Sequence, residues 1–128
     1  MERATHLAAD SRDSRLTLRR VERQQYLIER LYRCAHRLTF RQLADELSVT
    51  ERTIARDIAR LRHSGVPITV VPGRSGGAAL DHRATLEPLE LDLPEIAALL
   101  ASLTALGPTA SESASSAMDK LVTALHAK

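Results

Sequence analysis

Arginines at helical spacing are the residues of this chain whose types and positions suggest a chemistry. Arg52 and Arg56 lie one helical turn apart, and placed at 100° intervals they share one face with Ala59 and His63, flanked by Thr53 and Arg60. The opposite face of the same stretch is apolar and consists of Ile54, Ile58 and Leu61. Because guanidinium groups bind phosphate oxygens and guanine edges in pairs of hydrogen bonds, the arginine face suits a nucleic-acid groove. A solvated charged face is the alternative interpretation.

Two helix start signals place this stretch second in a pair of helices. Thr39 and Gln42 form a capping box, which predicts a helix running to about Leu47. After a turn at Ser48 and Val49, Thr50 caps the helix that carries the arginines, and Gly65 and Pro67 end it. Two short helices joined by so short a turn are typical of a helix-turn-helix.

The segments on either side of the pair complete a recognisable unit. Residues 15–35 have an apolar stripe at spacings of three and four, formed by Leu18, Val21, Gln25, Ile28, Leu31 and Tyr32, and predict an amphipathic helix with its arginines outward. Residues 68–71 and 78–80 predict two strands around a glycine-rich turn. A hairpin directly behind a helix-turn-helix is a wing.

The ends of the chain differ from this middle part. Residues 1–14 are small and polar, and we expect a flexible tail. Residues 81–92 form an acidic connector, after which Asp92 and Glu95 cap a leucine-rich helix that stops at Gly107. A last helix is expected over about Glu112 to His126. The predicted fold is mainly α: a winged helix-turn-helix at 15–83, made of three helices and a β-hairpin wing, followed by two C-terminal helices at 84–128.

Charge is unevenly distributed along the chain, although the net charge is only +2. Residues 15–83 carry fourteen Arg against seven acidic residues, whereas residues 84–128 carry two Lys against six acidic residues. Such asymmetry predicts that the middle segment faces a polyanion and that the C-terminal segment does not. A genome of high GC content, in which Arg codons are common, is the alternative explanation for Arg over Lys, but it does not explain why the positive excess is concentrated in one segment.

Other chemistries find little support in the residue pattern. The five histidines have no metal-ligand spacing, no Gly-x-Ser-x-Gly nucleophile motif occurs, and the glycine-rich turn lacks the lysine of a phosphate-binding loop. We therefore expect neither an enzyme nor a cofactor. Cys34 is interpreted as a small buried hydrophobic residue. Without a visible signal peptide or membrane span, the chain is expected to be cytoplasmic.

Residues 43–58, together with Leu61 and the run Gly65-Val66-Pro67-Ile68, resemble the winged helix of DeoR-type and WYL-domain bacterial transcription regulators. The turn at 72–77 is similar to the wing of that group, and residues 93–100 look like the helix that follows it. The resemblance implies a sequence-specific binder of double-stranded DNA that controls transcription.

The resemblance also implies roles for individual residues. Arg52, Thr53 and Arg56 would reach base edges or phosphates, and Thr50 would cap the helix and offer its amide to a phosphate. Arg41 would hold a phosphate, and the wing would reach the backbone or minor groove. The full set of expected DNA-binding residues is Arg41, Thr50, Arg52, Thr53, Arg56, Arg60, His63, Arg74 and Ser75. Asp57 is expected to orient a neighbouring arginine.

Four departures from the family pattern qualify this expectation. Ala55 stands where many relatives carry a second Arg, and Ser48 replaces the Gly that is frequent in the turn. Ala78-Ala79 replaces a Tyr-Arg pair, which predicts a poorly anchored strand. WYL-type relatives also continue for roughly 200 residues with an effector-sensing domain, whereas this sequence stops at Lys128. Three interpretations stay open: a truncated member, signal sensing elsewhere, or no signal sensing.

The C-terminal helices are expected to make a homodimer through residues 93–127, which would present two recognition helices to a pseudo-palindromic operator. Docking of these helices on their own winged helix is the alternative. For the chain as a whole, the alternatives to a transcription regulator are a protein–protein interaction module built on a winged helix and an RNA-binding winged helix.

Overall fold

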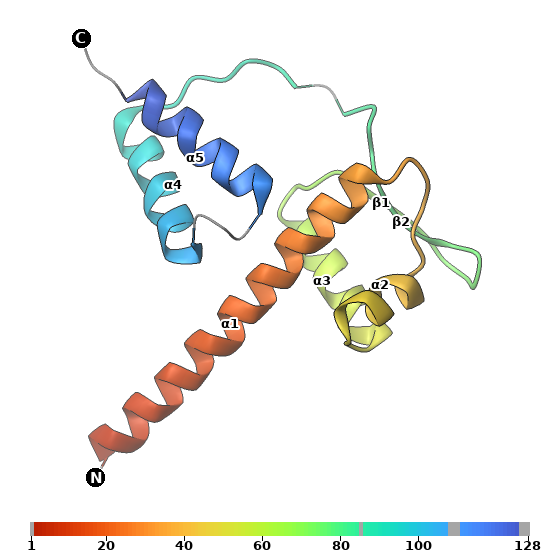
Figure 1. The fold of residues 1–128 in the computed structure, drawn as a ribbon, viewed down its shortest axis with the longest axis horizontal. Helices are drawn as coiled ribbons and strands as arrows, with labels where there is room; N and C mark the ends of the chain where they lie inside the picture. The colour runs from red at the N-terminus through yellow and green to blue at the C-terminus, as the bar shows by residue number, and fades with distance from the viewer. Residues whose placement is uncertain (1, 85, 108–110, 126–128) are drawn as a thin grey trace.

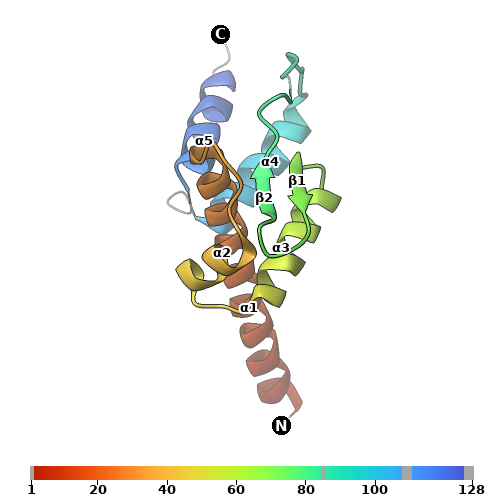
Figure 2. The same ribbon diagram turned by 90° about the vertical axis from the view of Figure 1, so that its right-hand side faces the viewer.

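The computed structural model describes residues 2–84, 86–107 and 111–125, and its described side chains begin at Leu16 and omit residues 17 and 18. Within these ranges the chain forms five helices and a two-stranded antiparallel hairpin (Figures 1 and 2). The elements are α1 (Glu2–Arg33), α2 (Phe40–Leu47), α3 (Glu51–His63), β1 (Ile68–Val71), β2 (Gly77–Leu80), α4 (Leu93–Leu106) and α5 (Glu112–Ala124). The predicted order of helix pair, wing and C-terminal helices is confirmed.

The helix α1 begins at Glu2, so the expected flexible tail over residues 1–14 was wrong for all but Met1, which lies outside the described residues. The segment contains no Gly or Pro, and its Ala, Arg, Glu and Leu residues favour helix. Its N-terminal half extends away from the other elements (Figure 1). Helix formation there follows from local propensity and from continuity with the packed half of α1.

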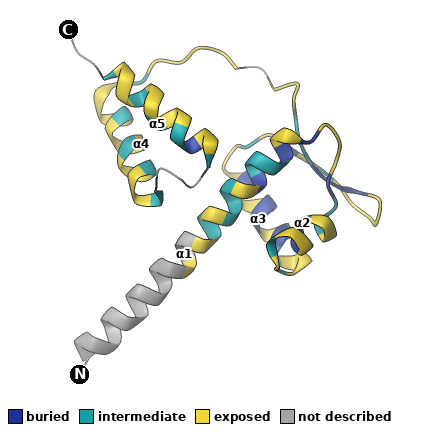
Figure 3. Ribbon diagram, in the orientation of Figure 1, coloured by how far each residue is buried: buried dark blue, intermediate teal, exposed yellow. Residues whose placement is uncertain are grey.

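The core lies where α1, α2, α3 and the hairpin meet (Figure 3). Its buried members are Leu27, Leu31, Cys34, Leu38, Leu43, Ala44, Ile54, Ile58, Leu61, Ile68 and Ala78. The apolar face predicted for α3 is therefore confirmed. The stripe predicted for α1 is confirmed at Leu31 and corrected at two positions, because Leu27, which it did not include, is buried and Tyr32 is exposed. Leu18 of that stripe lies outside the described side chains.

The caps that the sequence predicted define the helices. The Thr39 hydroxyl accepts a hydrogen bond from the Gln42 amide at 3.0 Å, and the Gln42 side chain accepts one from the Thr39 amide at 2.8 Å. Asp92 and Glu95 form the same reciprocal pair at α4. Between α2 and α3 the chain turns at Ser48, which adopts a left-handed conformation with φ of 55°.

The two C-terminal helices pack on each other and against the side of α1. The N-terminus of α5 makes polar contacts with α1: Glu29 Oε1 accepts from the Ser113 amide at 2.9 Å, and Ser111 Oγ donates to Gln25 Oε1 at 3.2 Å. Arg33 and Glu112 form an exposed ion pair. Within the described residues α4 buries none of its side chains, and α5 buries only Ala114 (Figure 3). Polar contacts thus tie the start of α5 to α1, and Ile96, Leu100 and Leu103 of α4 are only half-buried.

Candidate nucleic-acid interface

The helix α3 presents one face to the core and the other to solvent. Its buried residues are Ile54, Asp57, Ile58 and Leu61, and its exposed residues include Arg52, Arg56, Ala59, Arg60 and His63. The structure thus leaves four of the predicted site residues, Arg52, Arg56, Arg60 and His63, on the solvent side of α3. Such a face, second in a helix-turn-helix, has the position of a recognition helix.

The start of α3 is fixed by two threonines. Thr50 Oγ1 accepts from the Thr53 amide at 3.1 Å and lies 3.0 Å from Thr53 Oγ1. Thr50 is the N-cap, as predicted. Thr53 is half-buried and its hydroxyl already has a partner, so its polar atom serves the cap in this structure. The cap of α3 is therefore complete without a hydrogen bond from Glu51.

A groove lies between α2, the start of α3 and the wing, with a volume of about 1070 Å³. Arg41 of α2, Arg52 of α3 and Arg74 of the wing turn all line it. The structure therefore gathers these three predicted site residues from three elements around one hollow, while Arg56, Arg60 and His63 lie farther along α3. Ser75 is exposed in the wing turn beside Arg74.

Two carboxylates also line this groove, and neither is among the DNA-binding residues predicted from the sequence. They are Asp45 of α2 and Glu51, the first residue of α3. Helical spacing could have indicated both, because Asp45 follows Arg41 by one turn and Glu51 begins the recognition helix. The groove is consequently not a purely basic channel.

The wing is anchored through its second strand. In the hairpin, Ile68 pairs with Leu80 and Val71 with Gly77. Ala78 and Leu38 exchange two backbone hydrogen bonds, each 2.9 Å long, which tie β2 to the segment between α1 and α2. The prediction of a poorly anchored strand at Ala78-Ala79 was therefore wrong, because backbone bonds and a fully buried Ala78 replace large side chains.

Glycine is required where the wing meets that segment. Gly77 has φ of 139°, and a Cβ atom built on it would lie 2.2 Å from the Leu38 carbonyl oxygen. A Cβ on Gly76 would lie 1.9 Å from the Val71 carbonyl oxygen. These close backbone approaches let the hairpin fold back on itself and place Arg74 at its exposed tip.

The buried carboxylate of Asp57 connects α3 to α1. It is fully buried and accepts hydrogen bonds from Arg23 Nε, from Arg23 Nη2 at 3.2 Å and from Gln24 Nε2 at 3.5 Å. Arg60 Nη1 lies 3.9 Å from the same carboxylate. The structural role predicted for Asp57 is confirmed. The outward orientation predicted for the arginines of α1 was wrong for Arg23, which keeps only 20% of its side chain exposed.

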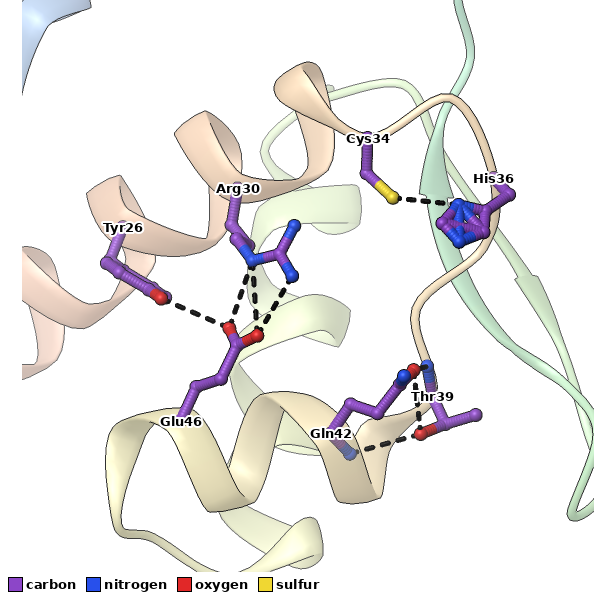
Figure 4. A network of polar contacts seen from close by, with 7 residues as sticks. All are labelled: Tyr26, Arg30, Cys34, His36, Thr39, Gln42 and Glu46. Carbon is purple, nitrogen blue, oxygen red and sulfur yellow. Dashed lines mark hydrogen bonds and ion pairs between the residues drawn. The ribbon is translucent and has the colours of Figure 1, made fainter.

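A second clamp joins α1 to α2 (Figure 4). Arg30 Nη2 donates to Glu46 Oε1 at 2.9 Å, and Tyr26 Oη donates to Glu46 Oε2 at 3.1 Å. The Arg30 hydrogen bonds hold the pKa of Glu46 below its usual 4.5, whereas burial and the same carboxylate raise the pKa of Tyr26. Together with Asp57, this clamp fixes both helices of the pair on α1.

Cys34 is buried at the end of α1, and its Sγ lies 3.0 Å from His36 Nδ1 (Figure 4). The interpretation of Cys34 as a core residue is confirmed by its place in the apolar cluster. No group of three or more potential metal ligands occurs among the described residues. No helix in the described part of the chain is long and apolar enough to cross a membrane.

Comparison with known proteins agrees with this geometry. No solved structure matches the chain. A family model described as HTH domain matches residues 23–77, which include the packed half of α1, both helices of the pair and the start of β2. The match does not separate DeoR-type from other regulators, so that finer resemblance stays a prediction. Residues 23–77 thus form a helix-turn-helix domain, and with the adjoining hairpin the fold is a winged helix-turn-helix, which points to DNA binding.

Proposed function

We propose that the chain is a sequence-specific regulator of transcription that binds double-stranded DNA through α3 and the wing. The observation that carries the proposal is the arrangement of arginines: Arg52 and Arg56 lie on the solvent face of α3, and Arg41 and Arg74 line the same groove as Arg52. Arg41 and Arg74 neutralise phosphates, and Arg52 and Arg56 contact base edges in the major groove. Thr50, Thr53, Arg60, His63 and Ser75 complete the proposed contact surface.

The rigidity of the HTH unit supports this proposal. Base readout requires side chains held in fixed positions, and α3 is held by the threonine cap, the core and the Asp57 contacts with α1. The resemblance to DeoR-type and WYL regulators supports the same function. The arginines position the protein on the DNA and recognise bases, and they do not react with the DNA.

Fluorescence anisotropy with the duplex upstream of the gene itself tests the proposal, with a shuffled duplex of equal composition as the control. We expect tight binding to the native duplex that persists at near-physiological salt, while binding to the shuffled duplex falls away as counterions compete. Arg56→Ala should weaken binding to the native duplex by about ten-fold or more and change binding to the shuffled duplex little. Arg83→Ala is the matched control, because Arg83 is 89% exposed in the connector outside the groove.

The same titration separates the alternatives. Equal binding of both duplexes, lost together as salt rises, would refute sequence specificity. Preference for a single-stranded or hairpin RNA competitor over duplex DNA would favour an RNA-binding winged helix. Absence of binding to either nucleic acid would favour a protein-interaction module.

We further propose that residues 93–127 act as a dimerisation element, so that two copies bind a pseudo-palindromic operator. The helix α4 is apolar and charge-free from Ile96 to Leu106, yet none of its side chains is buried, and Leu99 is 44% exposed. A second copy offers the same charge-free face, which makes a two-fold contact self-complementary. Residues 126 and 127 lie outside the described residues.

Sedimentation equilibrium tests the dimer. We expect a mass near twice 14.1 kDa for the native chain and a monomer for Leu99→Glu, which places a charge in the contact. Leu86→Glu is the control, because Leu86 is 97% exposed in the connector and should not affect the mass. A native chain that sediments as a monomer at micromolar concentration would contradict the proposal.

A further inference from the structure

The first residue of the recognition helix, Glu51, is an acidic residue in the first turn that makes no hydrogen bond to the helix cap. At α2 and α4 the residue three positions after the cap, Gln42 or Glu95, turns back to the cap amide. At α3 that position is taken by Thr53, whose amide and hydroxyl already meet Thr50. Glu51 stands two positions earlier and takes no part in the cap.

The surroundings of Glu51 leave its carboxylate available to a ligand. Glu51 is exposed and lines the groove between α2, α3 and the wing, next to Arg52. Among the residues that the structure describes, no Lys, Arg or His side chain forms an ion pair with it within 4.0 Å. It lies in the first turn of α3, where a negative charge suits the helix dipole.

An ionised carboxylate at this place has only one kind of favourable partner on DNA. Phosphate oxygens repel it, and the guanine edge in the major groove offers acceptors only. The donors in that groove are the amino groups of cytosine and adenine, and a carboxylate accepts from the cytosine N4 amino group. Residues at the start of a recognition helix are those that meet base edges.

We infer that Glu51 is a specificity-determining residue that accepts a hydrogen bond from the amino group of a cytosine in the target duplex, next to the base contacted by Arg52. This inference rests on the proposed DNA-binding function. Glu51 lowers affinity for DNA in general, because its negative charge is repelled by the phosphates, and affinity is regained only where a cytosine lies opposite it. Glu51 therefore contributes more to the discrimination between bases than to the affinity for duplex DNA.

Asp45 provides a matched control within the same groove. It is a second carboxylate that lines the hollow, but it belongs to α2, which does not enter the major groove in this docking mode. Loss of either charge should raise affinity for non-specific duplex. Only loss at Glu51 should change which base is preferred.

Selection from a randomised duplex library tests the inference, using the full chain and the variants Glu51→Gln, Glu51→Ala and Asp45→Asn. The native chain should enrich a motif with a required C:G pair. Glu51→Ala should lose that preference by about ten-fold or more at one position only, and Glu51→Gln should shift it toward A:T, since a Gln amide pairs with adenine. Asp45→Asn should keep the native motif and bind non-specific duplex more tightly.

Each other outcome has a definite meaning. An unchanged motif in both Glu51 variants, with thermal unfolding like that of the native chain, would overturn the inference while leaving the proposed function intact. A motif changed equally by Asp45→Asn would overturn it as well, because general electrostatics would then explain the effect. A native chain that enriches no motif would refute the proposed function itself, and the inference with it.

Discussion

Replacing Asp57 by Ala should be among the most damaging single substitutions in the winged helix, because it removes the acceptor for two side chains of α1. The carboxylate is fully buried, and Arg23 and Gln24 donate to it. Without the carboxylate, the largely buried Arg23 guanidinium loses its counter-charge. Breaking a buried ion pair from one side typically costs about 3–5 kcal/mol.

The exposure of Arg23 narrows this range. Its side chain keeps 20% of its surface in solvent, so it can turn partly to water, and we expect a loss near the lower end, about 3 kcal/mol. Small domains have total stabilities of about 5–15 kcal/mol, so this is a large fraction. Asp57→Asn keeps the shape and one acceptor oxygen and should lose less.

Urea unfolding followed by circular dichroism measures the effect, and Glu112→Ala serves as the control. Glu112 also pairs with an arginine of α1, but its side chain is 84% exposed, and exposed pairs contribute about 0–1 kcal/mol. A loss for Asp57→Ala no larger than that for Glu112→Ala would refute the reasoning. Equal losses in Asp57→Ala and in the double variant Arg23→Met, Asp57→Ala would also refute it, because the unmatched charge is the stated cause.

Two further predictions concern the wing and the clamp between α1 and α2. Gly77→Ala should destabilise the fold by more than the roughly 1 kcal/mol expected for positive φ alone, because its Cβ meets the Leu38 carbonyl oxygen. Gly73 has φ of 97° and no atom within 4 Å of a Cβ built on it, so Gly73→Ala should show only the conformational cost in the same urea experiment. Equal losses for the two would contradict the close approach. For the clamp, the pKa of Glu46 is lowered by Arg30, so its contribution to stability is present above its usual pKa of 4.5 and is lost as the pH falls through the lowered value. Thermal melts between pH 6 and pH 3 should therefore show a smaller acid-induced loss for Glu46→Gln than for the native chain, and parallel losses would show that the clamp does not contribute.

The helix boundaries in the middle of the chain could be predicted because they are encoded locally. Thr39 with Gln42, and Thr50 with the turn before it, mark starts that depend on a few neighbouring residues. The apolar face of α3 followed in the same way from its spacing. Such signals do not depend on the rest of the fold, which explains why the helix pair and the wing were placed correctly.

Features that depend on contacts between distant residues could not be predicted in this way. Arg23 and Asp57 are 34 positions apart, and nothing near Arg23 distinguishes it from a solvated arginine. The burial of Leu27 rather than Tyr32 depends on which side of α1 packs against the rest of the winged helix, and that contact joins distant parts of the chain. The docking of α5 on α1 uses polar groups, such as Glu29 and the Ser113 amide, that carry no hydrophobic pattern.

The proposed contact residues also include some that local spacing indicates and some that only the tertiary structure brings together. Arg52 and Arg56 were assigned by helical spacing alone, whereas the groove that brings Arg41 and Arg74 to the same place depends on how the wing folds back. A pattern of positive charge does not indicate Glu51, because it is an acidic residue directly before Arg52.

The segment of α1 from Arg23 to Arg33 contacts the helix pair on one side and α5 on another, and the helical twist fixes the angle between these two sides. Arg23, Leu27 and Arg30 face the helix pair, whereas Gln25, Glu29 and Arg33 face α5 at steps of four residues. Since each residue turns an α-helix by about 100°, one inserted or deleted residue near position 28 would rotate the two ends of this segment by that angle relative to each other. Changes of length are therefore excluded from this stretch, whereas α1 can be lengthened or shortened before Leu16 without altering the phase of either set.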